Sequence, residues 1–575
     1  MLNWLVSRIR KGEVDHLLGS DRASNAYLST LPAGDPQQKL AVLDEWIEDP
    51  ALLFSDLSAP LALHALARLD DFAQTSVEEC WVRYFNEGAS SFLSSSLLKC
   101  LQTHYTHLAG AYRHALTATV VPNAGDDRLK VRNSLARIAT RAMTALAEQK
   151  KISHFSYAGT DADWWRQAHE LLVFARVQGF LHIKQSLHPG SGEPTSVWRE
   201  YLIALQFETA PLSTLNRPQM ALLDILVRHV DANFICVDAF SPLTPFRVRI
   251  DQATGPSRCV PGQEESPAWR YFGPGQARTQ LVRIKAAITT NKPPAWIPAF
   301  CKPGDCLDLL DQMIQHWSIN PPQRQKTRQP QQRAMRVVNE FPLIRRMVSA
   351  SEFVRSGRTL DYDTHLQQKE LMRITLLGVT IEPSSLPIKT PQENLERMET
   401  AGDRQMTERW ELIDKGERGL GTRYEFRRAW QEINALVGYR FEDEIDWRIG
   451  IIRRLGRSHG KPNAGLTTFS ETPLSGQLDL CKGGNNCPWQ QQTRETSGHG
   501  LIDAILVSRA DKLLLIPREV YSVDRRGDLL LGSKRIPVQL MSLEASGPGY
   551  DLVRFRKVEA SEASTQPISI LRPFK

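Results

Sequence analysis

The 575-residue sequence has no apolar run of the roughly 18 residues that a membrane-spanning helix requires. It also has no GxxxxGK[ST] phosphate loop, no HExxH metal-binding pair and no GxSxG nucleophile turn. Its 14 histidines are scattered, without the spacing of metal ligands or of a catalytic triad. These absences predict a non-enzymatic protein with no transmembrane segment and no resident metal or cofactor.

Cysteine is scarce, with eight residues in the whole chain. The two pairs with the closest spacing, Cys301/Cys306 and Cys481/Cys487, lack the two-residue separation of zinc knuckles. We expect free thiols in surface loops, which suits a cytoplasmic protein. The first residues, MLNWLVSRIRKGEVDH, interleave apolar and charged side chains, which favours a short amphipathic helix over a cleaved signal peptide.

The overall composition is typical of a folded protein, with 41% hydrophobic and 23% charged residues. At roughly 150 residues per domain, the length suggests about three domains. The formal net charge of +7 is small for this length, but some of the basic residues are clustered. Seven of them lie in one short stretch with the single acid Glu340: Arg324, Lys326, Arg328, Arg333, Arg336, Arg345 and Arg346. We expect this stretch to form a surface patch that attracts anions.

Helical periodicity dominates residues 1–235. Segments such as QKLAVLDEWIE and DADWWRQAHELLVFARVQGFL place apolar residues at i, i+3, i+4 and i+7. Helix-starting residues such as Asp161 precede them. This region is expected to be an irregular helical domain. Residues 236–320 mix short β-type runs with helical segments, and are expected to form a mixed α/β connector that ends at the double proline of SINPPQRQ.

Strand patterns dominate the rest of the chain. WELIDKG, GTRYEF and DWRIGIIRRLGRS favour a small antiparallel β-barrel over residues 321–475, interrupted by a helical insertion at about 343–405. Residues 476–500 are rich in Gly, Asn and Gln and are expected to be a loop or linker. Residues 501–575 are expected to form a second small barrel, with a hairpin turn at GSKR. The predicted fold class is multidomain α + β: an all-α N-terminal half followed by two antiparallel barrels.

Two motifs in the first barrel region carry the candidate binding site. RQKTR places Arg324 and Arg328 four residues apart, where two guanidinium groups can grip phosphate oxygens and stack on bases. DKGERG is a turn between strands that combines the carboxylate of Asp414 with Gly416 and Gly419. Such a turn offers backbone N–H groups, and its carboxylate can accept from the N1/N2 edge of guanine. It is not a dinucleotide fingerprint, because strand-like TRYEF follows the glycines where a helix should begin.

In this order the two motifs resemble the PilZ domain, the bacterial receptor module for cyclic di-GMP. The pattern of that family is RxxxR, a barrel strand and then [D/N]xSxxG. Arg324 and Arg328 match the first motif, and Asp414 and Gly419 match the second. Gly416 stands where the family has serine, which removes a hydroxyl ligand. The order of helical half, barrel and second barrel is similar to that of a subgroup of long PilZ-like proteins.

The resemblance implies a cytoplasmic cyclic di-GMP effector in bacterial second-messenger signalling, with Arg324, Arg328, Asp414, Gly416 and Gly419 as ligand residues. Nucleotide binding would be transmitted to a protein partner through the helical region. The alternative is a degenerate PilZ-like scaffold that mediates protein–protein contacts without nucleotide. Nucleic-acid binding ranks last, because the net charge is modest and no aromatic stacking platform is visible. An apolar face on the helical insertion further suggests homo-oligomerisation.

Overall fold

The structure is a computed structural model. It describes residues 16–32, 34–86, 92–119, 128–190, 192–260, 268–321, 328–355, 407–417, 419–458, 460–480 and 501–558. Four predicted features lie wholly or mostly outside these ranges: the N-terminal amphipathic helix, Arg324, the later part of the helical insertion, and the pair Cys481/Cys487. The chain divides into two compact units, Met1–Arg324 and Gln325–Lys575.

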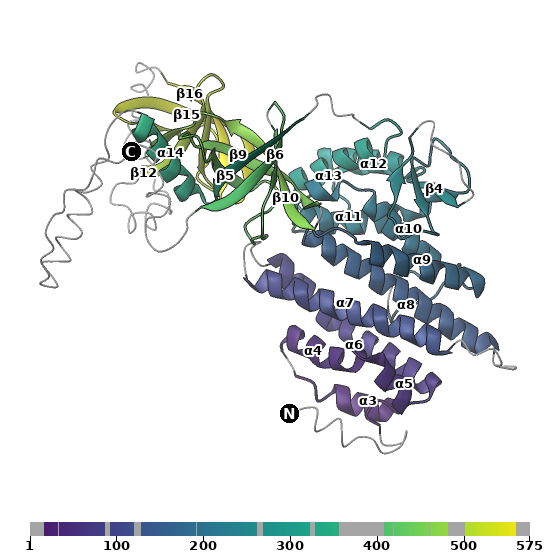
Figure 1. Cartoon of the computed structure of the whole chain (residues 1–575). Helices are drawn as coiled ribbons and strands as arrows, with labels where there is room; N and C mark the ends of the chain where they lie inside the picture. The colour runs from purple at the N-terminus through teal and green to yellow at the C-terminus, as the bar shows by residue number, and fades with distance from the viewer. Residues whose placement is uncertain are drawn as a thin grey trace, which may run out of the picture. The chain divides into compact units, whose positions relative to one another are not determined.

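The first unit begins with helices that pack on one another in succession (Figure 1). They are α3 (Asp21–Leu28), α4 (Pro36–Ile47), α5 (Pro50–Asp56), α6 (Ala59–Asn86), α7 (Phe92–Thr119), α8 (Arg128–Phe155), α9 (Ala162–Val177), α10 (Val197–Glu208) and α11 (Arg217–Val230). Side-chain caps fix several of their starts. Asp161 accepts from the backbone N–H of Trp164, and Asn216 forms a capping box with Gln219.

A small sheet and two further helices complete the first unit. The elements are β1 (Ile235–Val237), β2 (Phe246–Arg249), β3 (Ser257–Arg258), β4 (Trp269–Gly273), α12 (Ala277–Thr289) and α13 (Pro303–His316). The strands pair antiparallel in the order β1-β4-β2-β3. Helix α11 packs on α13, so this mixed segment shares its packing with the helical region.

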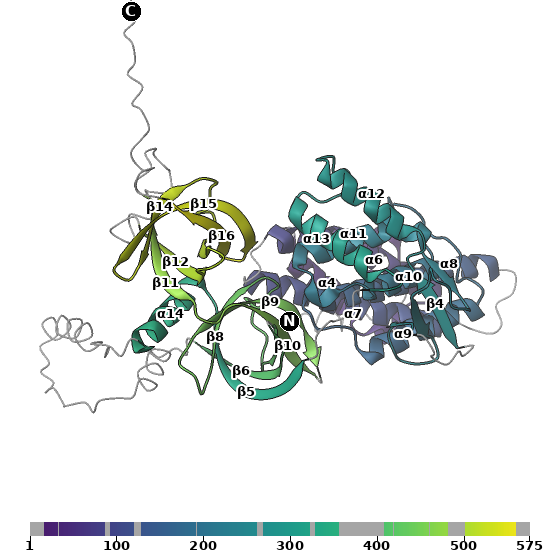
Figure 2. The same ribbon diagram turned by 90° about the horizontal axis from the view of Figure 1, so that it is seen from above.

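The second unit contains two closed antiparallel barrels, as predicted (Figure 2). The first is formed by β5 (Gln329–Val338), β6 (Glu408–Lys415), β7 (Gly419–Arg423), β8 (Leu436–Phe441), β9 (Arg448–Ser458) and β10 (Lys461–Ser470). The second is formed by β11 (Leu474–Asp479), β12 (Leu501–Ser508), β13 (Leu513–Pro517), β14 (Arg526–Leu531), β15 (Lys534–Gly547) and β16 (Tyr550–Lys557). The predicted turn at GSKR is present: Gly532 has a φ of 58° between β14 and β15.

Helix α14 (Phe341–Arg355) follows β5 and occupies the start of the expected insertion. It packs against β8 of the first barrel and against β11 and β12 of the second (Figure 2). Arg345 forms an ion pair with Asp503 at 3.1 Å. One buried cluster joins the helix to both barrels: Val338, Phe341, Ile344, Met347, Val348, Ala350, Leu436, Trp447, Ile449, Ile451, Ile505, Val507, Leu515, Tyr550 and Leu552. The helix therefore works as a shared core element of this unit.

Two predictions about loops are wrong. Cys301 and Cys306 are buried, with 7% and 2% of their surface exposed, because α11 and α13 pack around them. The start of the loop predicted for residues 476–500 is instead strand β11, which pairs with β12 and β14 and brings Leu478 into the core of the second barrel.

In the part of the chain that the structure describes, no helix is both long and apolar enough to cross a bilayer. No three described His, Cys, Asp or Glu residues lie together as a metal-binding group.

Candidate functional site

The candidate site is built on the hairpin that connects β6 to β7. In this hairpin Asp414 lies opposite Gly421, and Lys415 opposite Leu420. The turn is closed by a hydrogen bond of 2.7 Å, in which the backbone N–H of Gly416 donates to the carbonyl of Gly419. A strand follows the glycines, as the sequence predicts, so this is a barrel turn and not a helix-opening phosphate loop.

Strand β5 brings the first motif to the same hairpin. It pairs antiparallel with β6, with Gln329 opposite Lys415 and Pro330 opposite Asp414. Arg328 immediately precedes β5, so the register of this pairing places its side chain beside the turn. The two motifs are 86 residues apart in sequence and adjacent in the fold.

Arg328 and Asp414 form an ion pair. Nη1 of Arg328 donates to Oδ1 of Asp414 at 2.5 Å, and the side chains are 22% and 30% exposed. Both groups are therefore open to solvent and to a ligand. Ion pairs at partly exposed sites contribute little net stability, so this pair can open at small cost.

The three glycines of the hairpin differ in how closely they approach these two side chains. A Cβ atom at Gly416 would lie 3.7 Å from Cγ of Arg328, and one at Gly419 would lie 3.5 Å from Nη2 of the same arginine. At Gly421 a Cβ atom would lie 2.7 Å from Oδ1 of Asp414, which is closer than real Cβ atoms approach. Gly421 thus leaves the space in which the carboxylate of Asp414 lies across β7, a role that the sequence alone did not assign.

Arg333 and Arg336 of the basic stretch are neutralised by ion pairs, which corrects the prediction of an anion-attracting patch at these two positions. Arg333 pairs with Asp443 at 2.5 Å and with Glu444 at 2.9 Å. Arg336 pairs with Glu442 at 3.1 Å. These acids follow β8, which pairs with β5 in the closed barrel, so the strand order sets them against the arginines. Sequence patterns could not reveal this pairing.

The barrel interior next to the turn is nearly full. A space of about 10 Å³, lined by Lys415, Gly416, Tyr439, Arg448 and Glu471 among others, holds no more than one water-sized group. Burial raises the pKa of Tyr439 to about 12, and its hydroxyl forms a 2.7 Å hydrogen bond with Thr468. A nucleotide at this turn must therefore lie on the outer surface of the barrel.

Three other large side chains of the first barrel make contacts within it. Trp410 and Trp447 are each 1% exposed, and the ring of Trp410 stacks on Tyr424 with centroids 4.5 Å apart. Arg453 donates to Oδ1 of Asn434 at 2.7 Å. None of these contacts lies at the β6–β7 turn.

Comparison with known proteins gives one match. Residues 22–234 match the family model described as the cyclic-di-GMP receptor FimW, N-terminal domain. The match covers less than half of the chain and corresponds to α3 through α11. Searches of curated proteins and of solved structures found no match. The match lies in the first unit and agrees with the cyclic di-GMP receptor function expected from the barrel motifs of the second unit.

Proposed function

We propose that this protein is a non-enzymatic cyclic di-GMP receptor that binds the nucleotide on the outside of its first barrel in the manner of a PilZ domain. The main support for the proposal is the ion pair between Arg328 and Asp414, which the pairing of β5 with β6 places beside the glycine turn. The family model matched by the helical region supports the same ligand.

The geometry suggests how the nucleotide is held. A guanidinium group binds phosphate oxygens through charge-assisted hydrogen bonds, and its flat face stacks on a base. A carboxylate accepts from N1–H and the 2-amino group of guanine. Cyclic di-GMP has both phosphate and guanine groups. It can therefore replace the ion pair between Arg328 and Asp414 by giving Arg328 a phosphate and Asp414 a guanine edge. In the proposed complex, Arg324 adds a second guanidinium from the segment that precedes β5.

The signalling role follows from this placement. Arg328 lies close after the boundary between the two units, so nucleotide binding would act on the chain next to that boundary. A change in this segment would alter the surface that the helical region offers to a protein partner, in a cytoplasmic, bacterial signalling pathway.

A scaffold without nucleotide binding is the second candidate. It is favoured by Gly416, which lacks the hydroxyl of the family serine, and by the existing pairing of Arg328 with an internal carboxylate. Calorimetric titration of the full chain with cyclic di-GMP separates the two candidates. The receptor predicts saturable heat at micromolar concentrations, and the scaffold predicts none.

Replacing Gly416 by serine is expected to tighten cyclic di-GMP binding by about fivefold, since one added hydrogen bond contributes about 1 kcal/mol. The substitution fits, because the nearest atoms to a Cβ at this position are the Gly419 carbonyl at 3.6 Å and the Arg328 stem at 3.7 Å. Calorimetry measures the affinity, and Gly192→Ser, in open space in the first unit, is the matched control. Equal affinity of Gly416→Ser and wild type would contradict this prediction, because it would show that the serine hydroxyl adds nothing to nucleotide binding in this protein.

A further inference from the structure

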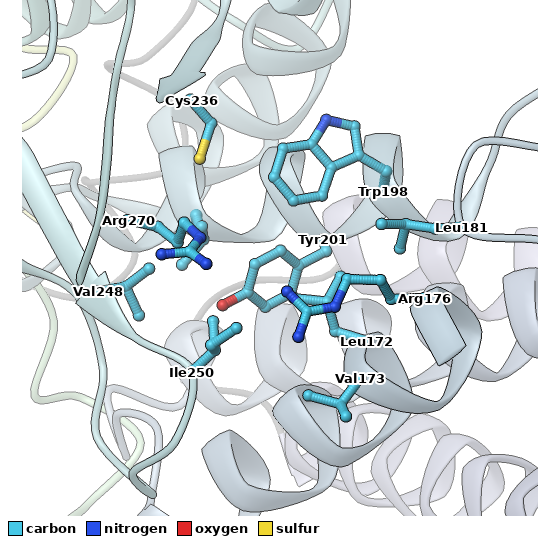
Figure 3. Close-up of a pocket in the computed structure, with 11 residues that line it drawn as sticks. Leu172, Val173, Arg176, Leu181, Trp198, Tyr201, Cys236, Val248, Ile250 and Arg270 are labelled. Carbon is cyan, nitrogen blue, oxygen red and sulfur yellow. The ribbon is translucent and has the colours of Figure 1, made fainter. Parts of the chain in front are cut away.

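One cavity of the first unit is too small for a cyclic dinucleotide (Figure 3). It lies between α9, α10 and strands β2 and β4, and its volume is about 40 Å³. A space of this size accommodates about three water-sized groups. We therefore expect the contacts that the nucleotide makes beyond Arg328 and Asp414 on the surface of the first barrel, next to these two residues.

A row of directly paired residues crosses four strands of this barrel and begins at Asp414. Asp414 on β6 lies opposite Gly421 on β7. Gly421 lies opposite Gly465 on β10, which in turn lies opposite Arg454 on β9. Directly paired residues of an antiparallel sheet share a face, so all four point to the same side of the barrel wall.

This row lies on the outer surface of the barrel. The next pair along β7 and β10 is Leu420 with Leu466, which are 2% and 1% exposed and fill the interior. Side chains alternate between the two faces of a strand, so the glycines of the row face outward. The two charged members agree with this: the side chain of Asp414 is 30% exposed, and Arg454 is an exposed residue.

The two glycines allow both charged side chains to lie flat on the barrel wall. A Cβ atom at Gly421 would lie 2.7 Å from Oδ1 of Asp414. A Cβ atom at Gly465 would lie 3.2 Å from Cβ of Arg454 and 4.0 Å from its Nε. The carboxylate therefore lies over β7 and the Nε atom over the adjacent strand β10. Since the Cα atoms of paired residues are about 4.5–5.5 Å apart, one dinucleotide can reach both groups.

A β-bulge directs Arg454 onto this row. Leu466 pairs with Ile452, but the preceding Gly465 pairs with Arg454, so Arg453 is an extra residue in β9. Bulges are frequent next to functional sites, where they redirect a side chain. Glycine inside a strand likewise often marks a place where a ligand approaches the backbone closely.

We propose that Arg454 is a further ligand residue of the nucleotide site and binds the second phosphate of the cyclic dinucleotide. This inference rests on the proposed function. In the strand order β5-β6-β7-β10-β9, Asp414 lies between Arg328 and Arg454. Cyclic di-GMP has two phosphates, so each guanidinium group would bind one of them while Asp414 accepts from a guanine edge.

Calorimetric titration of the full chain with cyclic di-GMP tests the proposal. Arg454→Ala is expected to weaken binding by about tenfold, the effect of losing a hydrogen bond to a charged group. Arg454→Lys is expected to lose less, because an ammonium group also pairs with a phosphate. Arg453→Ala is the control from the same bulge, since Arg453 donates to Asn434, and it should bind like the wild type.

The outcomes separate this inference from the proposed function. If the wild type binds and Arg328→Ala weakens binding, an unchanged affinity in Arg454→Ala would overturn the role of Arg454 alone. Equal losses in Arg454→Lys and Arg454→Ala would overturn the phosphate contact. No binding by the wild type would overturn both proposals. The thermal midpoint of Arg454→Ala should match that of the wild type, because the side chain is exposed; if it does not, Arg454→Gln decides in its place.

Discussion

Replacing Arg328 by alanine is expected to weaken cyclic di-GMP binding by about 30- to 150-fold, which corresponds to losing about 2–3 kcal/mol of charge-assisted hydrogen bonding. Arg328 is the described arginine that contacts the glycine turn, and its guanidinium lies against Gly419 and Asp414. Alanine has neither the charge for a phosphate nor a flat face for a base. Calorimetric titration of the full chain measures the change.

The barrel should remain folded in this variant, so the loss can be assigned to binding. Arg328 precedes β5, and its ion pair with Asp414 is partly exposed. The thermal midpoint should therefore change little. Arg453→Ala is the matched control: it removes an arginine that contacts Asn434 on the same barrel, and should leave the affinity unchanged. Equal affinity in Arg328→Ala and wild type would place any nucleotide site elsewhere.

Replacing Arg141 by alanine is expected to destabilise the first unit by about 3–5 kcal/mol, the cost of breaking a buried ion pair. The side chain of Arg141 is 2% exposed and pairs with Asp70 at 3.1 Å and with Asp71 at 2.6 Å. Its Nη1 also donates to the carbonyl of Ala67 at 2.9 Å. Burial disfavours the charge of Arg141, but Tyr112 and the aspartates outweigh it and raise its pKa.

The large effect follows from what the substitution leaves behind. The Asp70 side chain is 3% exposed, so without Arg141 its carboxylate stays buried with hydrogen bonds from Tyr112 and Gln74 but without a cation. Urea unfolding followed by tryptophan fluorescence measures the stability of this unit. Arg166→Ala is the control, since Arg166 forms its ion pairs on the surface of α9, and its midpoint should match that of the wild type. A midpoint for Arg141→Ala equal to that of the control would contradict this account of the core.

The candidate site was predictable because its parts carry local signals. The period-two pattern around WELIDKG and GTRYEF predicts two strands, and Asp414 with the glycines predicts the turn between them. The structure then brings Arg328 to Asp414 through the β5–β6 register. Arg324 lies outside the described residues, so its role stays a prediction.

The features that sequence reasoning missed depend on pairing across the fold. Arg333 and Arg336 are neutralised by acids that follow β8, and only the barrel order makes β8 a neighbour of β5. Cys301 and Cys306 carry no local sign of burial, because α11 covers them from a distant part of the sequence. Similarly, β11 is a short strand that becomes recognisable only once β12 and β14 pair with it.

The central claim is that Asp414 and Arg328 together hold cyclic di-GMP, with Asp414 recognising guanine. The most direct measurement is calorimetric titration of wild type and Asp414→Ala with cyclic di-GMP and cyclic di-AMP, because adenine lacks the N1–H and the 2-amino group. The wild type is expected to bind cyclic di-GMP more tightly than cyclic di-AMP by about tenfold or more. Asp414→Ala is expected to bind both weakly and without preference. Equal binding of the two nucleotides by the wild type, or an unchanged preference in Asp414→Ala, would contradict the account.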